Sequence, residues 1–210
     1  YQAYLFMAVG WLAANKPATT AFITAEKDRL TQQKSAKSIR QTWVPYASIS
    51  SNLKKAVLAA EDSGFAEHDG VEWQAIEKAA LENLQKGKIK RGGSTITMQL
   101  AKNLFLSPDR SLLRKGQELV ITFMLEAVLE KRRILEIYLN VAEWGEGVFG
   151  IEAAARHYYG VSARQLSVEQ SAWLASVLPA PKRFDKNRGS AFIRGKAEVI
   201  QARMPQVVLP

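Results

Sequence analysis

The chain has 210 residues, of which 47% are hydrophobic and 23% charged, a composition typical of a folded globular domain rather than a disordered chain. It contains no cysteine, which excludes a disulfide framework, a thiolate metal site and a cysteine nucleophile. Lysine and arginine number 29 against 20 aspartates and glutamates, and the formal net charge of +9 predicts an anionic partner such as nucleic acid, anionic lipid or a phosphorylated substrate.

The chain begins with an apolar segment, residues 1–15, that carries no charged side chain. A membrane-spanning helix needs about 20 apolar residues, so this run is too short to span a bilayer by itself. We interpret it as the outer end of a truncated membrane anchor, because its position at the N-terminus, its hydropathy and its lack of charged residues all agree with that role. The alternative is a buried or amphipathic N-terminal helix.

Residues 16–42 follow as a polar segment, with charges concentrated from residue 24 to residue 40. We expect a solvated helix or linker here. The main domain is expected over residues 43–210, entered through a short extended piece near residues 42–46, because the residue before a proline avoids the α region.

Helical periodicity dominates the rest of the chain, with apolar residues recurring every three or four positions. No other run shows convincing strand alternation, and neither a βαβ rhythm nor an internal repeat is present. The sequence therefore predicts a mainly α fold. The expected helices cover residues 49–60, 71–85, 94–106, 112–129, 134–141, 150–159, 168–178 (after a Ser167–Gln170 capping box) and 189–204.

The first polar break, residues 61–70, follows an apolar helix directly and begins with Glu61 and Asp62. Two acids at a helix C-terminus face the negative end of the helix dipole, so their placement needs a reason. A carboxyl group in an apolar setting has a raised pKa and serves as a general acid or base. The alternative is a solvated or ion-paired loop, in which His68 hydrogen-bonds locally.

The second break, residues 91–103, has two glycines followed by Ser94 and a helix start. Backbone N–H groups at such a start can hold an anion, although a plain glycine turn with a Ser or Thr cap explains the pattern equally well.

In the third polar break, residues 109–118, Ser111 is a candidate N-cap, and Arg114 and Glu118 have the spacing of an intrahelical ion pair. The strongly apolar residues that follow indicate that Glu118 lies near a buried face.

The fourth break, residues 143–150, has three glycines and two aromatic residues, which favour a tight structural loop. The two histidines, His68 and His157, are too few for a histidine-rich metal site. The sequence also lacks the common hydrolase, zinc-protease and dinucleotide-binding motifs.

Taken together, these segments resemble the peptidoglycan glycosyltransferase family of lipid II polymerases, which includes the glycosyltransferase domain of class A penicillin-binding proteins. The family patterns E-D-x-x-F-x-x-H-x-G, G-G-S-T-I-T-Q-Q-L-x-K-N, R-K-x-x-E and K-x-x-I-L-E-x-Y-L-N are matched by residues 61–70, 92–103, 114–118 and 131–140, except at Met98. Residues 179–184 are a looser match, and the loop over residues 141–150 looks like the monofunctional branch.

The resemblance implies a lysozyme-like α fold with a small membrane-proximal jaw lobe. It also implies an inverting reaction in which Glu61 is the general base that deprotonates the acceptor sugar 4-hydroxyl. That oxygen attacks the donor anomeric carbon and displaces polyprenyl diphosphate. Glu118 matches the family's second catalytic glutamate, on the donor side near the diphosphate or a divalent cation (Mg²⁺ or Mn²⁺). No organic cofactor is implied.

The resemblance also assigns binding residues. Those expected at the substrate and its diphosphate are Ser94, Gln99, Lys102, Asn103, Arg110, Arg114 and, on a weaker match, Arg194. The chemistry agrees, because lysine and arginine stabilise a departing diphosphate and arginine suits bidentate phosphate contacts. Met98 replaces a family glutamine and cannot hydrogen-bond as an amide does. If that glutamine contacts substrate, this protein should bind substrate more weakly, whereas at a structural position Met98 would simply pack. We expect reduced but not absent activity.

The implied partners are lipid II, the growing lipid-linked glycan, the bacterial plasma membrane and other cell-wall synthesis proteins. The implied location is single-pass, with the catalytic domain on the outer, periplasmic face. Two alternatives are a lytic enzyme on a lysozyme-like fold, which needs no cationic cluster, and a non-catalytic membrane scaffold of cell-wall synthesis. A nucleic-acid partner is not expected, because no recognised binding module accompanies the charge.

Overall fold

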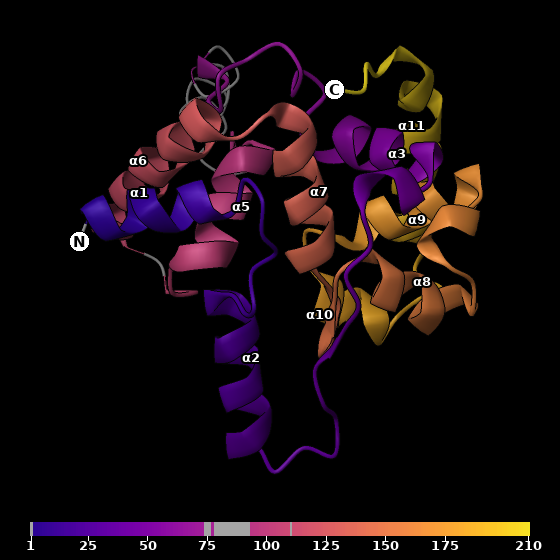
Figure 1. The fold of residues 1–210 in the computed structure, drawn as a ribbon. Coiled ribbons are helices and arrows are strands. Elements are labelled where there is room, and N and C mark those ends of the chain that lie inside the picture. The colour runs from indigo at the N-terminus through magenta and orange to yellow at the C-terminus, as the bar shows by residue number, and fades with distance from the viewer. Residues whose placement is uncertain (1, 74–76, 78–92, 110) are drawn as a thin grey trace.

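The computed structural model describes residues 2–73, 77, 93–109 and 111–210. Within them the fold is mainly α, as predicted (Figure 1). The helices are α1 (Gln2–Trp11), α2 (Ala21–Gln32), α3 (Ser51–Glu61), α5 (Ile96–Phe105), α6 (Leu112–Val128), α7 (Lys131–Val141), α8 (Ile151–Tyr159), α9 (Val168–Val177), α10 (Pro181–Asp185) and α11 (Ala191–Arg203). Most of the helix expected over residues 71–85 lies outside the described residues.

Helix starts follow the capping chemistry that the sequence predicts. The hydroxyl of Thr95 accepts from the Met98 backbone N–H, and that of Ser111 accepts from the Arg114 backbone N–H, so each satisfies a donor left free in a first helical turn. The expected capping box of α9 is present, because the side chains of Ser167 and Gln170 each accept from the other residue's backbone N–H.

The body is organised around α7, whose residues from Ile137 to Val141 are all buried. Figure 1 shows α7 in the middle, with α1, α5 and α6 on one side and α3, α9 and α11 on the other. Helix α5 packs against α6 and α7, while α9 packs against α3 and α11. Hydrogen bonds from Gln99 on α5 to Glu61 on α3, and from Tyr138 on α7 to Gln99, connect the two groups.

A small three-stranded sheet lies beside this body, in the order β1-β3-β2. Strands β1 (Arg40–Gln41) and β3 (Val148–Phe149) are parallel, and β2 (Glu143–Gly145) pairs antiparallel with β3. The extended entry expected near residues 42–46 is partly confirmed, because Pro45 is extended, but the strand itself lies just before it, at Arg40–Gln41. The expected loop at 143–150 is a β-hairpin. Strands of two or three residues are too short for alternation to reveal them.

Helix α2 and the segment that returns from it protrude from the body as a small lobe (Figure 1). The segment expected as a solvated helix or linker does form a helix, but it is not simply solvated. Glu26 is buried there and pairs with Arg29 at 2.7 Å and with Lys182. The pair with Lys182 joins the lobe to α10.

The N-terminal helix α1 packs against α6 and contributes Leu5 and Val9 to the core. Its other face is apolar and exposed, with Met7 67% and Trp11 51% accessible. In the part of the chain that the structure describes, no helix has the length and hydropathy needed to cross a membrane.

Candidate active site

A cavity of about 180 Å³ lies where α2, α5, α7, β2 and the turn between α9 and α10 meet. Its lining combines polar side chains with apolar residues and prolines. The lining residues are Phe22, Gln99, Lys102, Asn103, Tyr138, Ala142, Glu143, Leu178, Pro179 and Pro181. Three of the residues that sequence resemblance assigns to substrate therefore share one cavity.

Glu61 is linked to this cavity by a chain of hydrogen bonds. It is the last residue of α3, and its carboxylate Oε2 accepts from Gln99 Nε2 at 2.9 Å. Gln99 Oε1 in turn accepts from the buried Tyr138 hydroxyl at 2.9 Å. Among the described residues, no hydrogen bond engages the second carboxylate oxygen of Glu61. The chain fixes the orientation of the carboxylate and leaves one oxygen for a substrate proton.

Asp62, the neighbour of Glu61, has a structural task. It is buried, and its carboxylate accepts from the backbone N–H of Ile96 at 2.9 Å, at the positive end of α5. Its other oxygen lies 2.8 Å from His68 Nε2. Burial disfavours the imidazolium, but the hydrogen bond and the charge of Asp62 outweigh burial and raise the pKa of His68. The prediction that His68 hydrogen-bonds locally is confirmed.

Two further residues of the matched patterns hold this region together. Lys131 donates to the backbone carbonyl of His68 at 2.5 Å and pairs with Glu126 at 2.9 Å, which ties the loop after α3 to α7. Gly70 lies in that loop with a φ of +85°, and a Cβ atom there would approach the Glu126 side chain to 2.7 Å. These residues position the loop and line no part of the cavity.

A second polar cluster lies on α6. Glu118 is 3% exposed and accepts from Arg114 at 2.8 Å and from Lys115, so the predicted intrahelical pair is confirmed. Lys115 also donates to the Ser94 hydroxyl at 3.1 Å, which brings Ser94 to this cluster. The buried Nε of Arg114 has no hydrogen-bond partner among the described residues. An unpaired buried donor of this kind is suited to receive a ligand oxygen.

Lys102 connects the two groups electrostatically. Burial lowers the pKa of Lys102, while the charges of Glu118 and Glu61 act in the opposite direction. Its ammonium lies 5.4 Å from the centre of the Phe22 ring, at the edge of the α2 lobe. The charges of both candidate catalytic carboxylates therefore act on Lys102, which lines the cavity.

The remaining predicted residues have different outcomes. Asn103 is buried and lines the cavity, whereas Arg110 lies outside the described residues. Arg194 is exposed, donates to the carbonyl of Gly189 and does not line the cavity. Met98 is 1% exposed, which favours the alternative in which it packs; its effect on rate stays a prediction.

Sequence reasoning missed two titratable residues near the site. Lys196 of α11 is half-buried. Burial lowers its pKa, and the opposing charge of Glu61 only partly offsets this effect. It lies two positions from the predicted Arg194. Glu143 lines the cavity, although its segment was expected to be only a structural loop. No signal in the sequence marks its burial.

The expected divalent cation has few protein ligands in this arrangement. Both oxygens of Glu118 already face the cations Arg114 and Lys115, so the carboxylate fits a metal ion poorly. Among the described residues, no group of three or more His, Asp or Glu side chains could hold a metal ion. We therefore derive no step through a cation.

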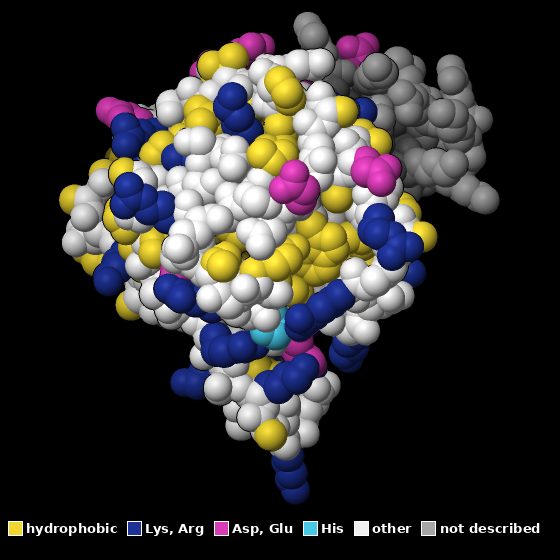
Figure 2. Space-filling model, turned by 90° about the vertical axis from the view of Figure 1, so that its right-hand side faces the viewer, with side chains coloured by type: hydrophobic (Ala, Val, Ile, Leu, Met, Phe, Trp, Pro, Cys, Tyr) yellow, Lys and Arg dark blue, Asp and Glu magenta, His cyan; other side chains and the backbone are white. Residues whose placement is uncertain are grey.

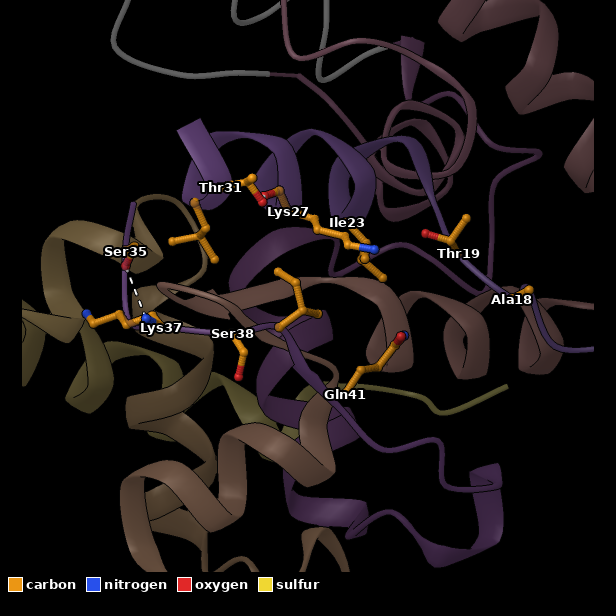
Figure 3. A pocket seen from close by; sticks show the side chains of 11 residues that line it. Ala18, Thr19, Ile23, Lys27, Thr31, Ser35, Lys37, Ser38 and Gln41 are labelled. Carbon is orange, nitrogen blue, oxygen red and sulfur yellow. Dashed lines mark hydrogen bonds between the residues drawn. The ribbon is translucent and has the colours of Figure 1, made fainter. Parts of the chain in front are cut away.

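Two other surface features lie around the site. A hollow of about 590 Å³ separates α2 from residues 35–41 and is lined by hydroxyl groups, amines and apolar side chains, including Thr31, Lys37 and Ile23 (Figure 3). It contains none of the predicted site residues.

On the face shown in Figure 2, Lys and Arg side chains are spread over the body and gather above the narrow α2 lobe, in agreement with the predicted anionic partner.

Comparison with known proteins supports the same conclusion as the motifs. A family model described as Transglycosylase matches residues 26–205. The biosynthetic peptidoglycan transglycosylase of Janthinobacterium sp. (strain Marseille) is 52% identical over 209 residues, which cover 100% of this chain and 90% of that protein. The proteins of the same name from Herminiimonas arsenicoxydans and Bordetella avium (strain 197N) are 52% and 50% identical, with 90% and 89% of their lengths covered.

Proposed function

This chain belongs to the transglycosylase family, and from that premise we propose that it polymerises lipid II into the glycan strands of peptidoglycan, with release of polyprenyl diphosphate. It is a glycosyltransferase. The observation that carries the proposal at the site is the carboxylate of Glu61, which accepts a hydrogen bond from Gln99, a residue that lines one cavity together with Lys102.

The reaction we propose transfers a sugar with inversion. The free oxygen of Glu61 takes the proton from the acceptor sugar 4-hydroxyl, and the resulting oxygen attacks the donor's anomeric carbon. The new bond between carbon and oxygen forms as the bond from that carbon to the diphosphate oxygen breaks, and the electron pair leaves with the diphosphate. Gln99 contributes by holding the base in one orientation, since a misplaced base loses much of its effect.

We propose that the cationic groups bind the leaving diphosphate. Lys102 and Arg114 lie on adjacent helices, α5 and α6, and Ser94 joins the same cluster through Lys115. Glu118 keeps Arg114 and Lys115 in place rather than meeting the diphosphate itself, because a carboxylate would repel it. Positive groups aimed at developing negative charge lower the barrier without reorganising during the reaction.

Membrane association follows from a substrate that carries a lipid tail, and a specific face of the molecule suits it. Helices α1 and α6 pack together, and both expose apolar side chains, among them Leu112, Leu113 and Phe123 on α6 and Met7 and Trp11 on α1. We propose that this face meets the outer side of the plasma membrane. An adjoining apolar pocket includes Trp11 and Phe105, only three residues beyond Lys102.

The test is polymerisation of labelled lipid II in detergent, followed as glycan ladders on a gel. We expect the wild type to form a ladder, Glu61→Gln to form none, and Glu67→Gln, an exposed acid in the same loop, to match the wild type. A ladder from Glu61→Gln would remove Glu61 as the base. Absence of a ladder from the folded, detergent-solubilised wild type would favour a non-catalytic scaffold instead.

A further inference from the structure

Glu143 is a carboxyl group in the candidate active site that the proposed mechanism does not use. It begins β2, two residues after α7 ends, and lines the same cavity as Lys102 and Asn103. Its side chain is 17% exposed. The hairpin therefore turns a carboxyl group inward, toward the place where the substrate is expected.

The contacts of this carboxyl group are incomplete, because it has an ion pair with Lys182 but one buried oxygen without a hydrogen bond. Its Oε1 is buried and has no hydrogen-bond partner among the described residues. The Lys182 ammonium lies 3.3 Å from that oxygen but is not aligned for a hydrogen bond, since it donates to Glu26 instead. A buried carboxylate oxygen without a hydrogen bond is costly, so the protonated form of the group, or a ligand that completes its contacts, is favoured.

The surroundings favour the protonated form. Burial and, to a smaller extent, the negative charge of Glu26 raise the pKa of Glu143 to about 7, against the opposing effects of Lys182 and Arg29. The charged or titratable groups around it are Lys182 on α10, Glu26 and Arg29 on α2, Lys102 on α5 and Tyr138 on α7. An anionic ligand beside Lys102 would add negative charge and stabilise the neutral acid still more.

The polar side chains that line the cavity without a hydrogen bond indicate which kind of ligand it could bind. Gln99 and Tyr138 are engaged in the chain to Glu61. Lys102, Asn103 and Glu143 are not hydrogen-bonded to any described residue through their side chains, which leaves an ammonium, an amide and a carboxyl group. An ionised carboxylate would repel the diphosphate that the ammonium attracts, whereas a neutral acid adds a hydrogen-bond donor.

We propose that Glu143 is a further binding residue for the donor diphosphate, to which it donates a hydrogen bond as a neutral carboxylic acid. This inference rests on the proposed function, because that function places a diphosphate beside Lys102. It assigns the 143–150 hairpin a role in substrate binding and makes binding sensitive to pH near neutrality. Ionisation of Glu143 removes the donor and introduces repulsion.

The experiment measures binding of farnesyl diphosphate to the full chain in detergent by calorimetry at pH 6, 7 and 8. If only the neutral form of a group titrating near pH 7 binds, the wild-type Kd rises about tenfold between pH 6 and pH 8 relative to that of Glu143→Gln. Glutamine keeps a hydrogen-bond donor and cannot ionise. Any pH dependence that comes from Lys102 or from the ligand itself is therefore present in both proteins and cancels when their Kd values are compared. Glu143→Ala should bind more weakly than Glu143→Gln at every pH.

A matched control is Glu146→Gln in the same hairpin, whose carboxylate pairs with Arg29 at 2.9 Å and with Lys37 and does not line the cavity. It should keep the wild-type pH dependence. Parallel pH curves for wild type and Glu143→Gln would overturn the inference while leaving the proposed function intact. A wild type that neither binds the diphosphate nor polymerises lipid II would instead refute the proposed function. A difference seen only with lipid II would move the contact to a sugar oxygen and overturn the assignment.

Discussion

Replacing Glu143 by glutamine should stabilise the protein, and the gain should depend on pH. Burial raises the pKa of this carboxyl group from its usual 4.5 to about 7. The folded state therefore holds the proton more tightly than the unfolded state does. Below about pH 4.5 Glu143 is protonated in both the folded and the unfolded state, so it does not lower the free energy of unfolding. As pH rises toward 7 the unfolded state ionises first, and the wild type loses stability.

The size of this loss follows from the shift. One pKa unit corresponds to about 1.4 kcal/mol, so a shift of about two and a half units costs about 3 kcal/mol once pH exceeds 7. Glutamine, which resembles the neutral acid in shape, avoids this cost. The difference in unfolding free energy between Glu143→Gln and wild type should thus grow by about 3 kcal/mol between pH 4.5 and pH 8.

Urea denaturation at several pH values measures this difference without adding salt. Glu146→Gln supplies a control of opposite sign, because hydrogen bonds from Lys37 and Arg29 lower the pKa of Glu146 to about 2. That variant should be less stable than wild type above pH 4.5, with the difference closing as pH falls toward 2. A difference between Glu143→Gln and wild type that does not change from pH 4.5 to pH 8 would refute the reasoning about Glu143.

Two further predictions concern α5. Gln99→Leu removes the donor that holds Glu61, and hydrogen bonds to charged groups contribute about 1.5–3 kcal/mol. We therefore expect kcat to fall at least about tenfold, with the circular dichroism spectrum unchanged. An unaltered kcat would show that Glu61 needs no such support. Met98→Gln places an amide where the side chain is 1% exposed, so we expect a loss of about 1–3 kcal/mol in urea denaturation and no gain in lipid II polymerisation. A faster variant would indicate that the amide contacts substrate.

The sequence predicted best what lies within one helix. The pair between Arg114 and Glu118 and the capping box at Ser167 depend only on spacing along the chain, and both are present. Apolar periodicity likewise located α3, α5, α6, α7, α8, α9 and α11 to within a few residues, whereas the short helix α10 was not predicted. The hairpin at residues 143–150 was missed, because its strands of two and three residues carry no periodic pattern.

The motifs of the sequence also identified the family and named Glu61, Gln99 and Lys102 before any fold was known. Only the tertiary structure showed that Gln99 holds Glu61 from 38 positions away, and that Tyr138 supports Gln99 from 39 positions away. The same holds for the buried carboxyl group of Glu143. Spacing along a helix is fixed by local geometry, whereas burial and pairing between distant segments depend on how the helices pack, and that packing decides which side chains share the cavity.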